Sequence, residues 1–149
     1  MRNAAIHATA ILIVMAGGLL IGTSFLPGDW YAALAKPAFT PPDWAFGPVW
    51  TVLYVLIGWA GARAWLGPDR TAKALWAGQM AANWAWSPVF FGQQNPAMGL
   101  VIILVMLALI LAFIAHNWTR DRQSAVLFLP YAVWVTLASA VNAGVVWMN

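Results

Sequence analysis

The chain has 149 residues, of which 63% are hydrophobic and only 7% are charged, and its formal net charge is +3. Soluble domains usually carry about 25% charged residues. This chain therefore has too few charges to cover its own surface with polar groups, and the composition predicts an integral membrane protein. Cysteine is absent, which excludes disulfides, thiolate nucleophiles and Cys-based metal sites.

The basic residues and the tryptophans narrow the function further. Because the 7 basic residues are scattered along the chain, they form no stripe that could follow a phosphate backbone, and we expect no nucleic-acid partner. The 11 tryptophans exceed what a belt at the membrane interface ordinarily needs, so they call for an additional role.

Five apolar stretches are each long enough to cross a hydrocarbon core of about 30 Å. A cleaved signal peptide is the alternative for the first stretch, because Ala33-Leu34-Ala35 resembles a cleavage site, but its apolar core is long. Pro88 is expected to kink the end of the third helix. We predict an all-α bundle of five transmembrane helices in one domain over residues 1–149, with helices at about 4–26, 41–66, 71–91, 96–118 and 123–147.

The one long connection, residues 27–43, is rich in proline and tryptophan. Its prolines break any continuous helix. Residues 29–35 could form a short interfacial helix that places Trp30 and Tyr31 at the lipid headgroups. Thr40, followed by two prolines and an aspartate, has the form of a capping box at the start of the second long helix.

The distribution of charge predicts the orientation. An excess of Lys and Arg marks cytoplasmic loops, so we expect a cytoplasmic N-terminus, with the long loop and the C-terminus outside, in a plasma-type membrane. The two sides carry Arg2, Arg63, Arg70, Lys73, Arg120 and Arg122 against Lys36 alone.

Polar and aromatic residues of three helices fall at one depth in the outer half of the membrane. Counting about 1.5 Å per residue places Trp50, Asn83, Trp134 and Asn142 beneath the long loop, with Ser87 nearby. Trp134, Ala138 and Asn142 form one stripe at i, i+4 and i+8.

This convergence predicts a cavity in the outer half of the bundle, roofed by residues 27–43. Trp50 and Trp134, with Trp84 or Trp86, would form flat apolar walls, and the asparagines would supply oriented hydrogen bonds, which suits a large, flat, mostly apolar ligand. The alternative is that the asparagines join helices and the tryptophans only pack.

A face of small residues on the third helix lies opposite Asn83. Such a face lets another helix approach closely, and we interpret it as a homodimer interface. Gly18 and Gly22, in G-x-x-x-G spacing, are a rival, and either face could instead pack within one subunit. The residues of the predicted interface are Ala74, Gly78, Ala81 and Ala85.

Other kinds of site find little support. A bis-His haem would need His7 and His116 to face each other, yet both lie near helix ends, and interfacial histidines are the simpler interpretation. The predicted spans hold no carboxylate in their interiors, which disfavours a proton-coupled carrier. We see no nucleophile–base set, phosphate-binding loop or metal-ligand cluster, and expect no obligatory cofactor and no metal.

Three motifs of this sequence resemble the TspO/MBR family, the tryptophan-rich sensory proteins and translocator proteins, in a bacterial-type member. They follow the family's order over nearly the whole chain. The motifs are Trp30-Tyr31-x-x-Leu34-x-Lys36-Pro37-x-x-x-Pro41-Pro42-x-Trp44-x-Phe46 followed by Val49-Trp50, then Asn83-x-x-Trp86-Ser87-Pro88-Val89-Phe90-Phe91-Gly92, and finally Pro130-Tyr131-x-x-Trp134 with Asn142.

The resemblance implies a five-helix bundle, usually a homodimer, that binds porphyrins such as protoporphyrin IX. It implies pocket residues at Trp50, Asn83 and Trp134. It also implies lining by Trp30, Tyr31, Phe46 and Phe90. In some bacterial members light-dependent porphyrin breakdown is attributed to tryptophans that match Trp50 and Trp134.

The sequence departs from the family pattern in two places. Ala38 and Phe39 stand where some bacterial relatives carry tryptophan, which weakens stacking of the loop on a porphyrin. The stretch 141–147 lacks the tyrosine and basic residue of a cholesterol-type motif, which argues against sterol binding there.

We therefore expect a membrane receptor or sensor that binds tetrapyrroles and related flat apolar ligands. The alternatives are a light-dependent porphyrin-degrading enzyme, for which the sequence offers aromatic electron donors but no acid–base machinery, and a small tetrapyrrole or sterol transporter. Trp50 and Trp134 are the candidate catalytic residues in the enzyme alternative.

Overall fold

The computed structural model describes residues 2–149, without the side chain of Arg2. The basic group of Arg2, which contributed to the predicted orientation, therefore lies outside the described part of the chain. Throughout this range the regular structure is helical, which confirms the all-α prediction. The elements are α1 (Arg2–Ser24), α2 (Asp29–Ala33), α3 (Asp43–Leu66), α4 (Arg70–Ser87), the π-helical turn η1 (Pro88–Gly92), α5 (Pro96–Asn117) and α6 (Arg122–Met148).

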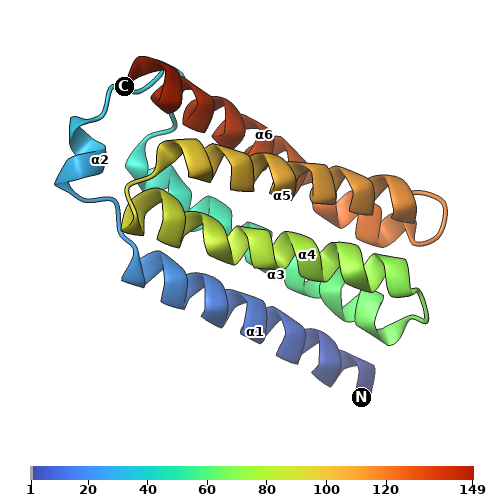
Figure 1. Cartoon of the computed structure of the whole chain (residues 1–149). Coiled ribbons are helices and arrows are strands. Elements are labelled where there is room, and N and C mark those ends of the chain that lie inside the picture. Colours follow the sequence, from blue (N-terminus) through green and yellow to red (C-terminus); the bar gives the residue numbers. More distant parts are fainter. Residues whose placement is uncertain (1) are drawn as a thin grey trace.

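The five long helices α1, α3, α4, α5 and α6 lie side by side in an up-and-down bundle (Figure 1). α3 packs against α1 and α6, and α5 packs between α4 and α6. The contact between α1 and α4 is smaller than these. α2 and the C-terminus lie at one end, which we call the lid end. The N-terminus and the α3–α4 and α5–α6 connections lie at the other, which we call the basic end after Arg63, Arg70, Arg120 and Arg122 (Figure 1).

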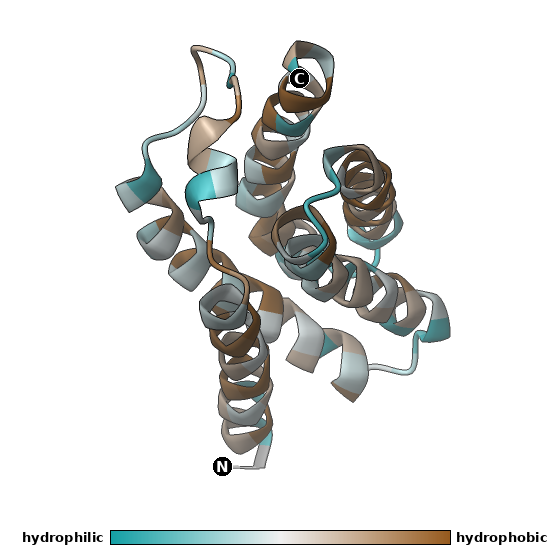
Figure 2. Cartoon of the chain, turned by 60° about the vertical axis from the view of Figure 1, so that its left-hand side comes forward, coloured by the Kyte–Doolittle hydropathy of each residue, from teal (hydrophilic) through white to brown (hydrophobic). Residues whose placement is uncertain are grey.

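Four helices, α1, α3, α5 and α6, are long and apolar enough to cross a membrane. α4 is not among them, because polar residues such as Gln79 and Asn83 lower its hydropathy. In Figure 2 the long helices are mostly brown or pale, and much of the hydrophilic colour lies at helix ends and connections. The structure is therefore that of a membrane helical bundle.

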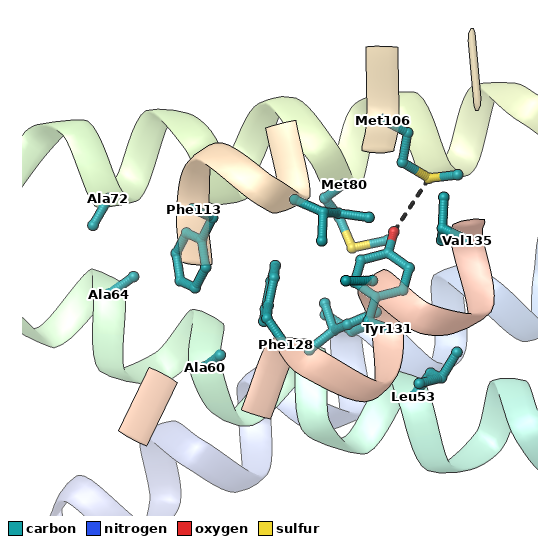
Figure 3. Packing of buried hydrophobic residues seen from close by; sticks show 14 of the residues in the cluster. Leu53, Ala60, Ala64, Ala72, Met80, Met106, Phe113, Phe128, Tyr131 and Val135 are labelled. Carbon is teal, nitrogen blue, oxygen red and sulfur yellow. Dashed lines mark hydrogen bonds between the residues drawn. The ribbon is translucent and has the colours of Figure 1, made fainter. Parts of the chain in front are cut away.

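A dense core of aromatic and small residues lies toward the basic end. The rings of Phe113 and Phe128 are 4.2 Å apart, both side chains are fully buried, and they pack among small residues such as Ala60 and Ala64 (Figure 3). Gly58 is required here, because a Cβ at this position would lie 2.6 Å from the Ile11 Cα. The absent side chain lets the α1 and α3 backbones touch.

Two proline-linked predictions need correction or refinement. The predicted capping box at Thr40 is wrong: its Oγ1 donates to the Pro37 carbonyl at 2.7 Å, and Pro42, in extended conformation, precedes the first residue of α3.

Proline also ends the regular α-helix at Pro88, where α4 gives way to η1 and the Gln93 N–H donates to the Pro88 carbonyl at 2.9 Å. Pro88 has no N–H, and its ring crowds the carbonyl one turn earlier, so the regular ladder cannot continue.

Aspartates hold the helix ends together at the basic end. Asp69 caps α4 by accepting from Thr71 N and Ala72 N, and it meets His116 Nε2 at 2.7 Å. The Ala72 N–H, followed by His116, lowers the pKa of Asp69.

Asp121 at the start of α6 pairs with Arg63 of α3 at 2.7 Å and accepts from the Ser124 hydroxyl. Burial acts to raise the pKa of Asp121, but the hydrogen bonds from Arg63 and Ser124 outweigh it and leave that pKa lowered.

Candidate functional site

A cavity of about 850 Å³ occupies the half of the bundle nearest the lid end. Its size falls in the range of about 300–1,000 Å³ that is typical of small-molecule sites. Residues of α1, α3, α4, η1, α5 and α6 form its walls, and the long connection covers it with Tyr31 and Pro41. The predicted convergence of helices beneath a proline-rich roof is therefore present in the fold.

Paired aromatic rings form the walls. Trp50 lies over Tyr54, one turn later on α3, with ring centroids 5.2 Å apart. Phe46 meets Trp134 of α6 edge-on at 5.6 Å. These spacings are typical of favourable aromatic pairs, so the rings support one another while their other sides face the cavity.

The floor of the cavity is a hydrogen-bonded chain between four helices, α3, α4, α6 and α5. Asn83 Oδ1 accepts from the Tyr54 hydroxyl at 3.3 Å, and Asn83 Nδ2 donates to the Tyr131 hydroxyl at 2.8 Å. Tyr131 in turn donates to the sulfur of Met106 at 3.2 Å (Figure 3). A buried amide must find partners, and Asn83 finds them in the protein.

Asn142 also has partners in the protein. Its Oδ1 accepts from Trp86 Nε1 at 3.1 Å, and its Nδ2 donates to the Pro96 carbonyl at 2.8 Å. Trp86 is stacked on Phe90 with centroids 4.7 Å apart. Both asparagines therefore join helices, as the alternative interpretation held, and they also line the cavity.

Few polar atoms on the cavity wall lack a partner in the protein. Trp134 Nε1 is buried and has no hydrogen-bond partner within residues 2–149. A buried donor of this kind costs about 1–3 kcal/mol when it stays unpaired. Trp134 therefore combines a ring on the cavity wall with a buried, unpaired N–H, which the apolar role predicted for it did not include.

The connection over residues 27–43, which we call the lid, is held by an aromatic contact on its inner side and by hydrogen bonds to the C-terminal residue. Tyr31 packs edge-on against Phe91 at 5.3 Å. Asn149 Nδ2 donates to the Ala35 carbonyl at 2.9 Å, and its Oδ1 accepts from Ala35 N at 3.0 Å. Burial, and then the negative charge of Asp43, raise the pKa of Tyr31.

The structure brings nearly all the predicted ligand-binding residues to this one cavity. Trp30 does not line it: its indole packs on Phe90 at 5.9 Å and supports the wall from behind. Trp84 also lies elsewhere, against Gly17 of α1, so Trp86 is the tryptophan of α4 on the wall. The predicted residues that line it are Tyr31, Phe46, Trp50, Asn83, Ser87, Phe90, Trp134, Ala138 and Asn142.

Several wall residues were missed by reasoning from the sequence. α1 contributes a long apolar strip that includes Leu19 and Gly22, and Asp43 lies at the lid end of the cavity. The Gly18–Gly22 spacing was the available signal, but it was interpreted as a rival dimer face. The side chain of Tyr54 occupies the place of a Cβ at Gly18, so that glycine serves packing within the subunit.

The predicted dimer residues lie on a mostly outward face of α4. Ala74, Ala81 and Ala85 are exposed. Gly78 turns toward α5, where a Cβ would lie 3.4 Å from Leu109. The four residues therefore do not form one continuous outward stripe.

Each of the two histidines has a partner of its own within the described chain. His116 is paired with Asp69, whereas His7 packs edge-on against Trp59 at 5.5 Å. No group of three or more His, Cys, Asp or Glu side chains gathers among the described residues.

The family model described as TspO/MBR family matches residues 9–148. Among curated relatives, the tryptophan-rich protein TspO of Archaeoglobus fulgidus is 42% identical over 123 residues, covering 80% of each chain. The tryptophan-rich sensory protein of Cereibacter sphaeroides is 37% identical, covering 86% of this chain and 82% of its own. The human translocator protein is 36% identical, covering 84% of this chain and 79% of its own.

Proposed function

Because the chain belongs to the TspO/MBR family, which its match over residues 9–148 establishes, we propose that it is a membrane receptor that binds porphyrins or similar flat apolar molecules. The aromatic cavity carries this proposal. About 850 Å³ of space walled by Trp50, Phe46 and Trp134 suits a broad, flat, mostly apolar ligand. The role would be sensing or handling of tetrapyrroles. Of these, only a sensory role accords with the name of the tryptophan-rich sensory relative.

The test is a titration with protoporphyrin IX in the dark, followed by tryptophan fluorescence. We expect saturable quenching, weakened in Trp50→Phe and Trp134→Phe because each removes an indole from the wall. Trp147→Phe is the matched control, since Trp147 also lies at the lid end but is 91% exposed. Quenching that does not saturate, or that all three variants change equally, would contradict the proposal.

Light-dependent breakdown of the porphyrin is the second candidate. The observation that favours it is the position of two indoles, Trp50 and Trp134, on the wall of one cavity, where they could donate an electron to a photoexcited ring. Illumination in air after the dark titration separates the two functions. A receptor leaves the porphyrin absorption spectrum unchanged, whereas an enzyme erases it in a manner that Trp50→Phe or Trp134→Phe abolishes.

Transport finds less support. The interiors of the helices carry no carboxylate, because Asp43 is the first residue of α3 and the remaining acids, Asp29, Asp69 and Asp121, lie in α2 or in connections. Coupled carriers commonly use intramembrane acids to move protons or ions, so the described helices offer no such coupling group.

The membrane arrangement belongs to the same proposal. We propose that α4 spans the membrane with the four more apolar helices, because it lies among them in the bundle (Figure 1). The basic end would face the cytoplasm and the lid end the outside. Reactivity of single cysteines introduced at Asp29 and Arg120 toward a membrane-impermeant thiol reagent tests this orientation.

We further propose a homodimer through α4. Its exposed small residues Ala74, Ala81 and Ala85 would let a second copy approach closely. Sedimentation in detergent should show Ala81→Leu shifted toward monomer, while Ala140→Leu, at an exposed position on α6, leaves the dimer intact. The opposite result would remove α4 from the interface.

A further inference from the structure

The cavity has a marked imbalance of charge. Among the described residues that line it, Asp43 is the only aspartate, and no lysine, arginine or histidine lines it. The remaining polar wall groups are amides, hydroxyls, phenols and indoles. A ligand carboxylate placed here would therefore meet no cation.

The nearest candidate cation by sequence, Lys36, has its own partners. Its Nζ donates to the carbonyls of Tyr31 at 2.6 Å and Leu34 at 3.0 Å, and it lies 4.5 Å from the centre of the Tyr31 ring. This cation stabilises the C-terminal end of α2 and is not part of the cavity wall.

Asp43, by contrast, keeps an uncompensated charge. It is exposed, and it is not one of the two aspartates that form ion pairs within the described chain. As the first residue of α3 it lies where the helix dipole stabilises an anion. Its charge also reaches the covering connection, since the negative field of Asp43 adds to the effect of burial in raising the pKa of Tyr31.

We propose that Asp43 acts as a charge filter at the lid end of the cavity, so that the site favours flat apolar ligands whose polar groups are neutral or cationic over the same ligands bearing free carboxylates. An anion moved out of water without a cation loses hydration that nothing repays, and a second anion close by adds repulsion. This inference rests on the proposed binding function and names the chemical class that the site prefers.

The test compares protoporphyrin IX, which carries two carboxylates, with its dimethyl ester in the dark fluorescence titration. Each variant is measured in the same lipid nanodiscs, so that partition of each ligand into lipid cancels in the ratio of variant to wild type. We expect Asp43→Asn to lower the Kd of the diacid by about three- to fivefold and to leave the ester within about twofold. Asp43→Lys should lower the Kd of the diacid further.

Asp29→Asn is the matched control. Asp29 begins α2 at the same end of the molecule and does not line the cavity, so this variant changes the net charge equally and should leave both Kd values unaltered. Circular dichroism checks that all variants fold.

The possible results distinguish failure of the charge filter from failure of porphyrin binding. If both ligands bind but Asp43→Asn leaves the diacid unchanged, or acts no more strongly than Asp29→Asn, the charge filter is wrong and the porphyrin site stands. If neither ligand gives saturable quenching in any variant, the binding function falls and the filter falls with it.

Discussion

Aromatic residues play different roles in the two halves of the bundle: in one half they fill a core, and in the other they line a cavity. In the core half, toward the basic end, Phe113 and Phe128 are fully buried against one another and their neighbours. In the lid half, Trp50 and Trp134 pair with other aromatic rings on one side only and border an open cavity on the other.

The glycines show where the difference arises. At Gly58 and Gly61 an added Cβ would collide with Ile11 and with the Trp76 ring, whereas at Gly22 and Gly47 it would meet nothing within 4 Å. The α1 and α3 backbones therefore touch at Gly58 in the core half. Toward the lid end the Tyr54 ring packs against Gly18, and space remains at Gly22 and Gly47. Aromatic residues close a core where small residues oppose them, and they wall a cavity where the helices stand apart.

The largest effect that would separate the halves is loss of a ring. Phe128→Ala should lower the free energy of unfolding by about 3–5 kcal/mol, because it leaves a cavity in dense packing. Phe46→Ala, at the edge of existing space, should cost less than about 1.5 kcal/mol, close to the value of its pair with Trp134. Unfolding titrations in one detergent provide the measurement, and equal losses would contradict the contrast between the halves.

Added volume should reveal the same contrast with a smaller amplitude. Gly58→Ala is expected to destabilise the bundle by about 1–3 kcal/mol, since the methyl group must push Ile11 and its backbone aside. Gly22→Ala should be neutral or slightly stabilising, because it meets open space and alanine favours helix. Thermal midpoints of the two variants decide the matter, and a larger loss at Gly22 would show that the space is closed.

The paired charges of the core half should make its stability depend on pH. The folded-state pKa of Asp121 is lowered, so the stability it contributes is present above its unfolded value of about 3.9 and is lost as the pH falls through the lower folded value. Because the pair with Arg63 is partly exposed, we expect at most about 1 kcal/mol. Thermal midpoints from pH 6 to pH 2 should fall more in wild type than in Asp121→Asn, and parallel curves would exclude this contribution.

The smallest expected effect concerns the lid. Asn149→Ala removes the paired hydrogen bonds to Ala35 and should raise amide exchange over residues 29–37 by about three- to tenfold, without a change in the overall midpoint. Met148→Ala, one residue earlier, is the control. Unchanged exchange in Asn149→Ala would show that other contacts hold the lid.

Composition and the spacing of residues by themselves determined that this chain is a helical membrane protein. Too few charges for a water-facing surface, together with long apolar stretches, leave few alternatives. Counting the rise per residue along the predicted helices likewise placed Trp50, Asn83, Trp134 and Asn142 at one depth. The match to the family model over residues 9–148 confirmed the resemblance of the sequence motifs to the family.

Only the tertiary structure decided what these residues touch. The amides of Asn83 and Asn142 form hydrogen bonds with Tyr54, Tyr131, Trp86 and the Pro96 carbonyl. Asp43, the first residue of α3, borders the cavity. The reason is physical: depth follows from a fixed rise per residue along one helix, whereas the partner of a side chain depends on how far apart neighbouring helices stand and how each is rotated. In lipid that distance is set by close packing of small residues against large ones, which becomes definite only when all the helices are in place.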